Sequence, residues 1–205
     1  IMMVMLAALV SCERRPLTEP DFKTRVDVQI RVKAIANVTC DVYNSKIQIP
    51  TIEPEVLRVM FYDLDDDRMV GESFISDIGM TDEGETSISG EVSIIPGDYR
   101  LMVYSFGTES TLISKYDSWE KCNAYTDPLS TEMLKTLALK HPDDGQYIHY
   151  QPDHLLVARS ENESIPWHSG THVIHATASS VVESYYLQVK VNGLEYVSSA
   201  RAVAR

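Results

Sequence analysis

Apolar and polar residues alternate most regularly near the start of the chain, over residues 25–34. Valine, isoleucine and alanine take every second position from Val26 to Ala34, while charged and amide side chains take the positions between them. Because successive side chains of a β-strand point to opposite faces, this pattern predicts a strand with one buried and one solvated face. Such a strand suits a β-sandwich in which a second sheet lies beneath it.

A second strong signal lies over residues 95–106, which read Ile-Pro-Gly-Asp-Tyr-Arg-Leu-Met-Val-Tyr-Ser-Phe. Pro96 and Gly97 suit the central positions of a type II turn, since proline fixes a negative φ and glycine accepts a positive one. The turn predicts a hairpin that joins residues 86–95 to residues 99–106. The second of these strands is largely apolar on both faces, which predicts a position inside the sandwich.

Shorter apolar or alternating runs predict further strands over residues 38–43, 56–62, 69–78 and 155–158. Short strands separated by turn residues at such intervals predict an all-β fold, either a sandwich or a barrel. Residues 130–139 are ambiguous. Ser130 can cap a short helix, whereas Leu137 and Leu139 alternate as they would in a strand.

Changes in composition predict the domain organisation. Residues 161–170 are polar and contain Pro166 and Gly170, which predicts a linker after an N-terminal β-sandwich domain at residues 25–160. Residues 171–205 predict the start of a second β-sandwich domain, with a hairpin turn at Asn192-Gly193. The alternation continues to the last residue, so we expect this second domain to be truncated.

The first residues predict an export signal. Met2 to Val10 form an uncharged apolar run that is too short to span a bilayer and has the length of a signal-peptide core. The run ends in Leu-Val-Ser-Cys12, which resembles the lipobox of bacterial lipoproteins. That resemblance implies a signal peptide at residues 1–11, a diacylated Cys12, and a tether at residues 12–24 that holds the folded part at a membrane surface. The alternative is an ordinary signal peptide, or a buried helix with an incidental cysteine.

Charge restricts the possible partners. The 205 residues include 30 acidic and 18 basic side chains, for a net charge of -12. This charge repels phosphate backbones at long range and argues against nucleic-acid binding. Solubility of an exported protein explains the excess of acid, and a specific cation site is the alternative. Cys40 and Cys122 can form a disulfide in an exported protein, but a buried free thiol fits them equally well.

Two groups of residues are candidates for metal binding. The acidic run 63–67 begins like a calcium loop, but an EF-hand would need Gly in place of Arg68 and Glu in place of Phe74. A solvated turn is the simpler interpretation. His168, His172 and His175 have offsets that share a face only on a helix, whereas their neighbours favour loop and strand. We therefore assign no metal and no cofactor.

The chain lacks the sequence patterns of the common catalytic sites. It has no Gly-x-Ser-x-Gly elbow, no glycine-rich phosphate loop after a strand, and no paired carboxylates at a suggestive spacing. We predict that the protein is not an enzyme.

Three features together resemble the fimbrillin-like lipoproteins of Bacteroidales, a family related to type V pili. These features are the lipobox at Cys12, the amphipathic strand 26–34 after a short tether, and the segment 96–105. The segment 185–200 also resembles the opening strands of the family's second domain. The resemblance implies two transthyretin-like, Greek-key β-sandwich domains and an outer membrane lipoprotein at the cell surface or in a fimbria.

The family resemblance also implies a non-enzymatic role as a fimbrial subunit or anchor, whose partners are other fimbrial subunits and, through its lipid, the membrane. Members that polymerise are cut after an arginine near the first strand, and the vacated groove accepts a strand from a neighbouring subunit by β-strand addition. Arg25 and Arg31 are the candidates for such proteolytic maturation. Either arginine can equally be a solvated strand residue.

Two other functions remain open. The protein can be a monomeric surface lipoprotein that binds glycan or a host protein through its tyrosines and the loop around Trp119. It can also be a β-sandwich accessory domain of a longer exported enzyme.

Overall fold

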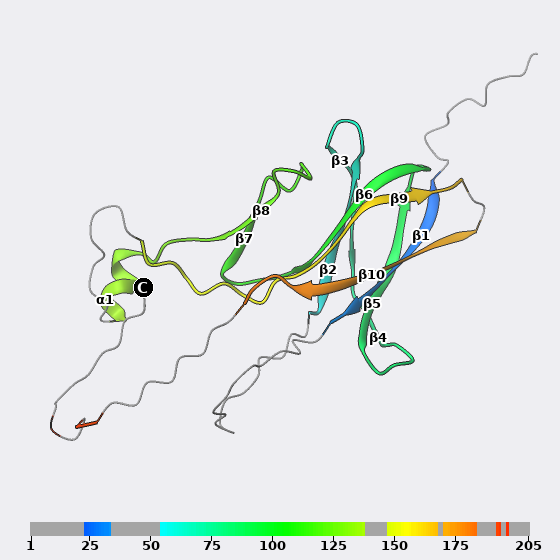
Figure 1. Ribbon diagram of the computed structural model, residues 1–205. Coiled ribbons are helices and arrows are strands. Elements are labelled where there is room, and N and C mark those ends of the chain that lie inside the picture. Colours follow the sequence, from blue (N-terminus) through cyan, green and yellow to red (C-terminus); the bar gives the residue numbers. More distant parts are fainter. Residues whose placement is uncertain are drawn as a thin grey trace, which may run out of the picture.

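Figure 1 shows a computed structural model of the chain, which describes residues 23–33, 54–137, 147–167, 170–183, 192–193 and 196. These residues form ten strands and one short helix. Their bounds are β1 (Thr24–Val32), β2 (Val56–Asp63), β3 (Met69–Ile75), β4 (Asp77–Met80), β5 (Thr86–Ile94), β6 (Gly97–Phe106), β7 (Thr111–Ser114), β8 (Asn123–Thr126), α1 (Thr131–Thr136), β9 (Leu156–Ile165) and β10 (Thr171–Ser180).

Eight of the strands follow one another in the hydrogen-bonded order β3-β2-β6-β9-β10-β1-β5-β4. This array folds over itself into two layers (Figure 1), which we call sheet A (β10, β1, β5 and β4) and sheet B (β3, β2, β6 and β9). The two layers are joined where Ser179 and Ser180 of β10 pair with Val157 and Leu156 of β9. The predicted all-β sandwich is confirmed.

The strand predicted near the start of the chain is β1. As predicted, its apolar side chains face the core and its polar side chains face outward. Val26, Val28 and Ile30 are fully buried in the core between the sheets, together with inward side chains of β2 such as Val59 and Phe61. Burial of each of these side chains stabilises the fold by about 1.5–3 kcal/mol. β1 pairs antiparallel with β5 and parallel with β10, so both of its backbone edges are hydrogen-bonded.

A second apolar cluster covers the outer face of sheet B. It contains Met60, Tyr62, Met102, Tyr104, Trp119 and Leu155. Residues 115–122 lie over this face, and β7 pairs with β8 in a separate two-stranded sheet to one side of the sandwich (Figure 1). The cluster explains why β2 and β6 are apolar on both faces.

The predicted hairpin at Pro96-Gly97 is wrong. β5 and β6 are consecutive, but β5 lies in sheet A and β6 in sheet B, so the turn carries the chain from one layer to the other. Gly97 does not have a positive φ, as a type II turn would require. A Cβ at Gly97 would instead lie 3.0 Å from the Tyr99 hydroxyl oxygen, so the small residue makes room for the ring of Tyr99.

The structure also differs from the predicted domain boundary. Half of the predicted linker is strand, because β9 continues to Ile165 and pairs there with Gly97 of β6. The next strand, β10, is not the start of a separate unit, since it pairs with β1 from Thr171 to Ala178. The polar stretch 161–164 resembled a linker because β9 buries few side chains there, although its backbone is paired with β6.

The ambiguous stretch that begins at Ser130 contains the helix α1. The Ser130 hydroxyl accepts a hydrogen bond from the Met133 amide at 3.1 Å and caps the N-terminus of α1. The predicted strand at 38–43 and most of the segment 184–205 lie outside the described residues.

Candidate functional site

The candidate site is centred on β1, because the two candidates for proteolytic maturation, Arg25 and Arg31, lie on this strand. Arg25 pairs with Ser93 on one side and Thr171 on the other, and Arg31 pairs with Ser87 and Thr177. Both arginines therefore lie within a strand whose backbone is engaged on two sides. Without β1, sheet A would keep a groove flanked by β5 and β10 and floored by the core.

Both arginine side chains point to the solvated face of sheet A and form ion pairs. The Arg25 Nε lies 3.7 Å from a carboxylate oxygen of Glu91. Arg31 reaches the β4–β5 loop, with Nη1 2.9 Å from Glu83 and Nε 3.3 Å from Glu85. All of these side chains are exposed enough for water to screen the pairs. Cleavage at Arg25 or Arg31 stays a prediction.

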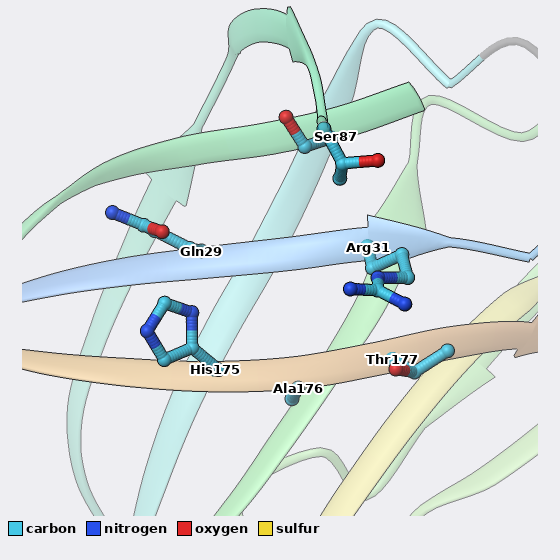
Figure 2. A pocket seen from close by; sticks show the side chains of 7 residues that line it. Gln29, Arg31, Ser87, His175, Ala176 and Thr177 are labelled. Atoms are coloured by element: carbon cyan, nitrogen blue, oxygen red, sulfur yellow. The ribbon is translucent and has the colours of Figure 1, made fainter. Parts of the chain in front are cut away.

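A shallow groove of about 460 Å³ runs over the same face (Figure 2). Its lining is more polar than apolar and comprises Gln29, Arg31, Thr81, Ser87, His175, Ala176 and Thr177. The sequence alone could not show this groove, because its residues come from β1, β5, β10 and the loop between β4 and β5.

The groove offers hydrogen bonds but no serine–histidine pair. Ser87 lies on β5 and His175 on β10, with β1 between them. Strands two positions apart are separated by roughly 9.5 Å, which is too far for a hydrogen bond between a serine and a histidine.

Trp119 does not provide an exposed contact surface. Its side chain is only 5% exposed and packs edge-on against Tyr62, with ring centroids 5.6 Å apart. The Arg159 guanidinium covers the indole at 4.1 Å. The Tyr62 hydroxyl donates a hydrogen bond of 2.7 Å to the Tyr116 carbonyl and so attaches residues 115–122 to sheet B. The expectation that the loop around Trp119 contacts a ligand is therefore wrong for this residue.

The titratable groups beneath this segment are held neutral. Burial raises the pKa of Tyr62, of Tyr104 and of the Cys122 thiol. A thiol of raised pKa is a poor nucleophile, so Cys122 is built as a packing residue. It forms no disulfide with any described residue, while Cys12 and Cys40 lie outside the described part of the chain.

An arginine that the sequence analysis missed organises the outer face of sheet B. Arg58 Nε donates to Glu72 at 2.9 Å, and its Nη1 donates to the Tyr104 hydroxyl at 2.8 Å. The guanidinium lies 4.2 Å from the Tyr116 ring centre and 5.8 Å from that of Phe74. The sequence does contain a signal for this role, because Arg58 is a charged residue inside the apolar run 56–62.

The acidic run 63–67 is a structural turn. The Asp63 carboxylate accepts hydrogen bonds from the amides of Asp65 and Asp66, and Asp67 accepts from the Ser118 hydroxyl at 2.6 Å. These oxygens organise the chain itself. In the described residues, no group of three histidine, cysteine or acidic side chains is placed to hold a metal ion.

His172 and His175 lie on β10, where their odd spacing places them on opposite faces, and His168 lies outside the described residues. The two histidines that the structure describes therefore cannot bind the same metal ion.

The free edges of the sandwich are also candidate sites. Among the described residues, β3 and β4 stand at the two ends of the strand order. The outer edge of β3 is partly engaged, because the Met69 amide donates to the Asp117 carbonyl at 2.9 Å, whereas no described strand pairs with the outer edge of β4. On β4, Ile78 is 63% and Met80 76% exposed. An exposed edge that carries apolar side chains is a template for pairing with another strand.

The described residues define an all-β sandwich with an open edge at β4 and a polar outer face on sheet A. The chain belongs to the family described as "Domain of unknown function (DUF5119)", which it matches over residues 11–204.

Among curated proteins, the chain is 25% identical over 201 residues to the "putative fimbrium anchoring subunit Fim4B" of Bacteroides ovatus. The match covers 97% of this chain and 50% of that protein, so the chain spans about half the length of this relative.

The chain is also similar to solved structures. The crystal structure of a "putative adhesin" from Bacteroides ovatus has a TM-score of 0.52 and 23% identity, and the match covers 84% of this chain and 50% of the other. This likeness supports the fold. The fimbrial anchor protein Mfa2 from Porphyromonas gingivalis has a TM-score of 0.40 and 12% identity, with 76% of this chain and 50% of the other covered.

The predicted lipid-attachment segment is outside the described residues. Within the part that is described, no helix is long and apolar enough to cross a membrane.

Proposed function

We propose that this protein is a fimbrial subunit of the anchoring type. It is a non-enzymatic lipoprotein, held at the outer membrane through Cys12 and joined to other fimbrial subunits by β-strand addition. The similarity to the fimbrium anchoring relative carries the proposal, because it extends over 97% of this chain. The amphipathic first strand and the open edge of β4 support it.

An anchoring role is favoured over a polymerising role by the order of residues at the N-terminus. An anchor must keep the covalent connection between its lipid and its folded part. Cleavage after Arg25 or Arg31 would break that connection, since Cys12 precedes both. The pairing of β1 with β5 and β10 favours retention of this strand.

The free edge of β4 is a suitable place for strand addition. A partner strand there would extend sheet A through main-chain hydrogen bonds and would cover Ile78 and Met80. The edge of β3 is less open, because its Met69 amide already donates to the Asp117 carbonyl.

The test is to isolate the protein from its native envelope and to determine its mature N-terminus by mass spectrometry. We expect an N-terminus at acylated Cys12 and copurification with fimbriae. A Cys12→Ser variant should release fimbriae into the medium, whereas Cys122→Ser should not. A lipid-free N-terminus after Arg25 or Arg31, together with a detergent-resistant ladder on unboiled gels, would instead identify a polymerising subunit.

The other candidate is a monomeric surface lipoprotein that binds a soluble glycan or a host protein. The polar groove over β1 and β10 is the observation that favours it, since its side chains offer many hydrogen bonds. An acylated protein that never copurifies with fimbriae would support this alternative.

A further inference from the structure

A second, smaller cleft lies at the base of the β7–β8 hairpin, away from β1. Its volume is about 150 Å³, and it is lined by Glu109, Ser110, Leu112, Asp127 and Tyr150. Sites for small organic ligands usually have about 300–1,000 Å³. This cleft is therefore sized for one side chain and not for a whole ligand.

Hydrogen bonds fix one wall of the cleft. A single carboxylate oxygen of Asp153 accepts from the amides of Ser110 and Thr111, each at 2.7 Å. The Asp153 amide in turn donates to the hydroxyl of the buried Thr111 at 2.8 Å. These three bonds join segments that are about forty residues apart, so the wall is preorganised before any partner arrives.

The opposite wall is held by the backbone. The Tyr150 amide donates to the Asp127 carbonyl at 3.1 Å, and the neighbouring Leu129 amide donates to the Ile148 carbonyl at 2.7 Å. Asp127 and Tyr150 are thereby held side by side in this wall.

The cleft carries two acidic side chains. Neither Glu109 nor Asp127 forms an ion pair within the described part of the chain. Leu112 and the ring of Tyr150 add apolar surface beside the two carboxylates. An aromatic face attracts a cation, and the aliphatic stem of a long basic side chain packs on apolar surface.

We propose that this cleft takes the side chain of an arginine or lysine presented by a protein partner. The stem lies against Leu112 and Tyr150, and the charged head meets Glu109 and Asp127. Arginine is preferred, because its planar guanidinium can donate to carboxylates in pairs and can lie on an aromatic ring. The net charge of -12 helps a basic partner to approach. The inference goes beyond the fimbrial role, since it applies to any protein partner.

The probe is Nα-acetyl-arginine amide, and its control is Nα-acetyl-citrulline amide, which has nearly the same shape without the charge. Both are titrated into the isotope-labelled protein, and amide shifts are followed by NMR. We expect the arginine probe to shift the amides of Ser110, Leu112 and Tyr150, with an affinity that falls as salt is added. The citrulline probe should bind at least about tenfold more weakly, which corresponds to 1.4 kcal/mol.

The matched variants are Glu109→Gln with Asp127→Asn, and separately Glu132→Gln. The paired substitution should reduce the affinity for the arginine probe at least about tenfold. Glu132 is an acid on the nearby helix α1 and does not line the cleft, so its variant should bind as the wild type does. The amides of β1 report whether each variant is folded.

Equal binding of both probes, or unchanged binding in the folded paired variant, would overturn the inference. Shifts confined to another surface would overturn it too. Neither result would affect the mature N-terminus or copurification with fimbriae, so the proposed function is tested separately.

Discussion

The hydroxyl of Tyr99 donates a hydrogen bond to the carbonyl oxygen of Ile95 at 2.7 Å and closes the turn that carries the chain between the two sheets. The ring packs over Gly97 and contacts Phe61 edge-on, with centroids 6.1 Å apart. A tyrosine that bonds to the backbone a few residues upstream, at a corner between sheets, recurs in Greek-key sandwiches.

We expect Tyr99→Phe to lower the free energy of unfolding by about 0.5–1.5 kcal/mol, because it removes one hydrogen bond and leaves the Ile95 carbonyl without this donor. Urea denaturation measures the change. Tyr125→Phe, at an exposed ring on β8, is the control and should have little effect. Equal effects in the two variants would contradict a role for the Tyr99 hydroxyl.

The distance between the sheets is set partly by Gly90. A Cβ at this position would lie 2.6 Å from the Ile75 side chain of the opposite layer. Gly90→Ala should therefore force the sheets apart and destabilise the protein by about 1–3 kcal/mol. Ser93→Ala, on the exposed face of the same strand, is the matched control. A stabilised Gly90→Ala would show that the sheets shift at little cost.

The contacts of Arg58 with Glu72 and Tyr104 should stabilise the fold through the shape of the guanidinium as well as through its charge. Arg58→Lys keeps the charge but cannot donate to Glu72 and Tyr104 with the same geometry. We expect a loss of about 1–3 kcal/mol. A double-mutant cycle with Glu72→Gln should give a coupling energy of at least about 0.5 kcal/mol. Additive effects would show that the two side chains act independently.

Acid should weaken the attachment between Asp153 and the start of β7. Burial disfavours the ionised carboxyl, but hydrogen bonds from Thr111 and Ser110 outweigh burial and lower the pKa of Asp153. A carboxyl whose pKa is lower in the folded state stabilises that state above its unfolded-state pKa, about 3.9, and this contribution is lost as the pH falls through the folded-state pKa.

Asp153→Asn should accordingly lose stability at pH 7 and show a shallower further loss below about pH 4. Urea midpoints measured from pH 7 to pH 2 give both curves. Parallel curves for the wild type and the variant would mean that Asp153 does not contribute to the acid sensitivity.

Elements that depend on local pattern could be predicted from the sequence. β1 was found because its alternation is regular, and β6 was found to be an interior strand because both of its faces are apolar. Ser130 and its capped helix were one of two open interpretations.

The sequence could not predict which strands pair when they lie far apart in the chain. A turn at Pro96-Gly97 is compatible with a hairpin and with a crossing between layers, and only the packing of Tyr99 decides. The parallel pairing of β1 with β10 joins segments more than a hundred residues apart. The small cleft likewise brings together Glu109, Asp127 and Tyr150, which are separated along the sequence.

The burial of Trp119 can be tested by fluorescence, because the only other tryptophan has the opposite environment. Trp119 is 5% exposed beneath Arg159, whereas Trp167 is 68% exposed at the end of β9. In a Trp167→Phe variant, all tryptophan emission comes from Trp119. We expect this emission to be shifted to shorter wavelength and to resist quenching by iodide, since the quencher cannot reach a ring enclosed by Tyr62 and Arg159. Unfolding in urea should restore quenching to the level of a free indole. Strong quenching in the folded variant would show that residues 115–122 open readily, and the loop around Trp119 would then again be available to a ligand.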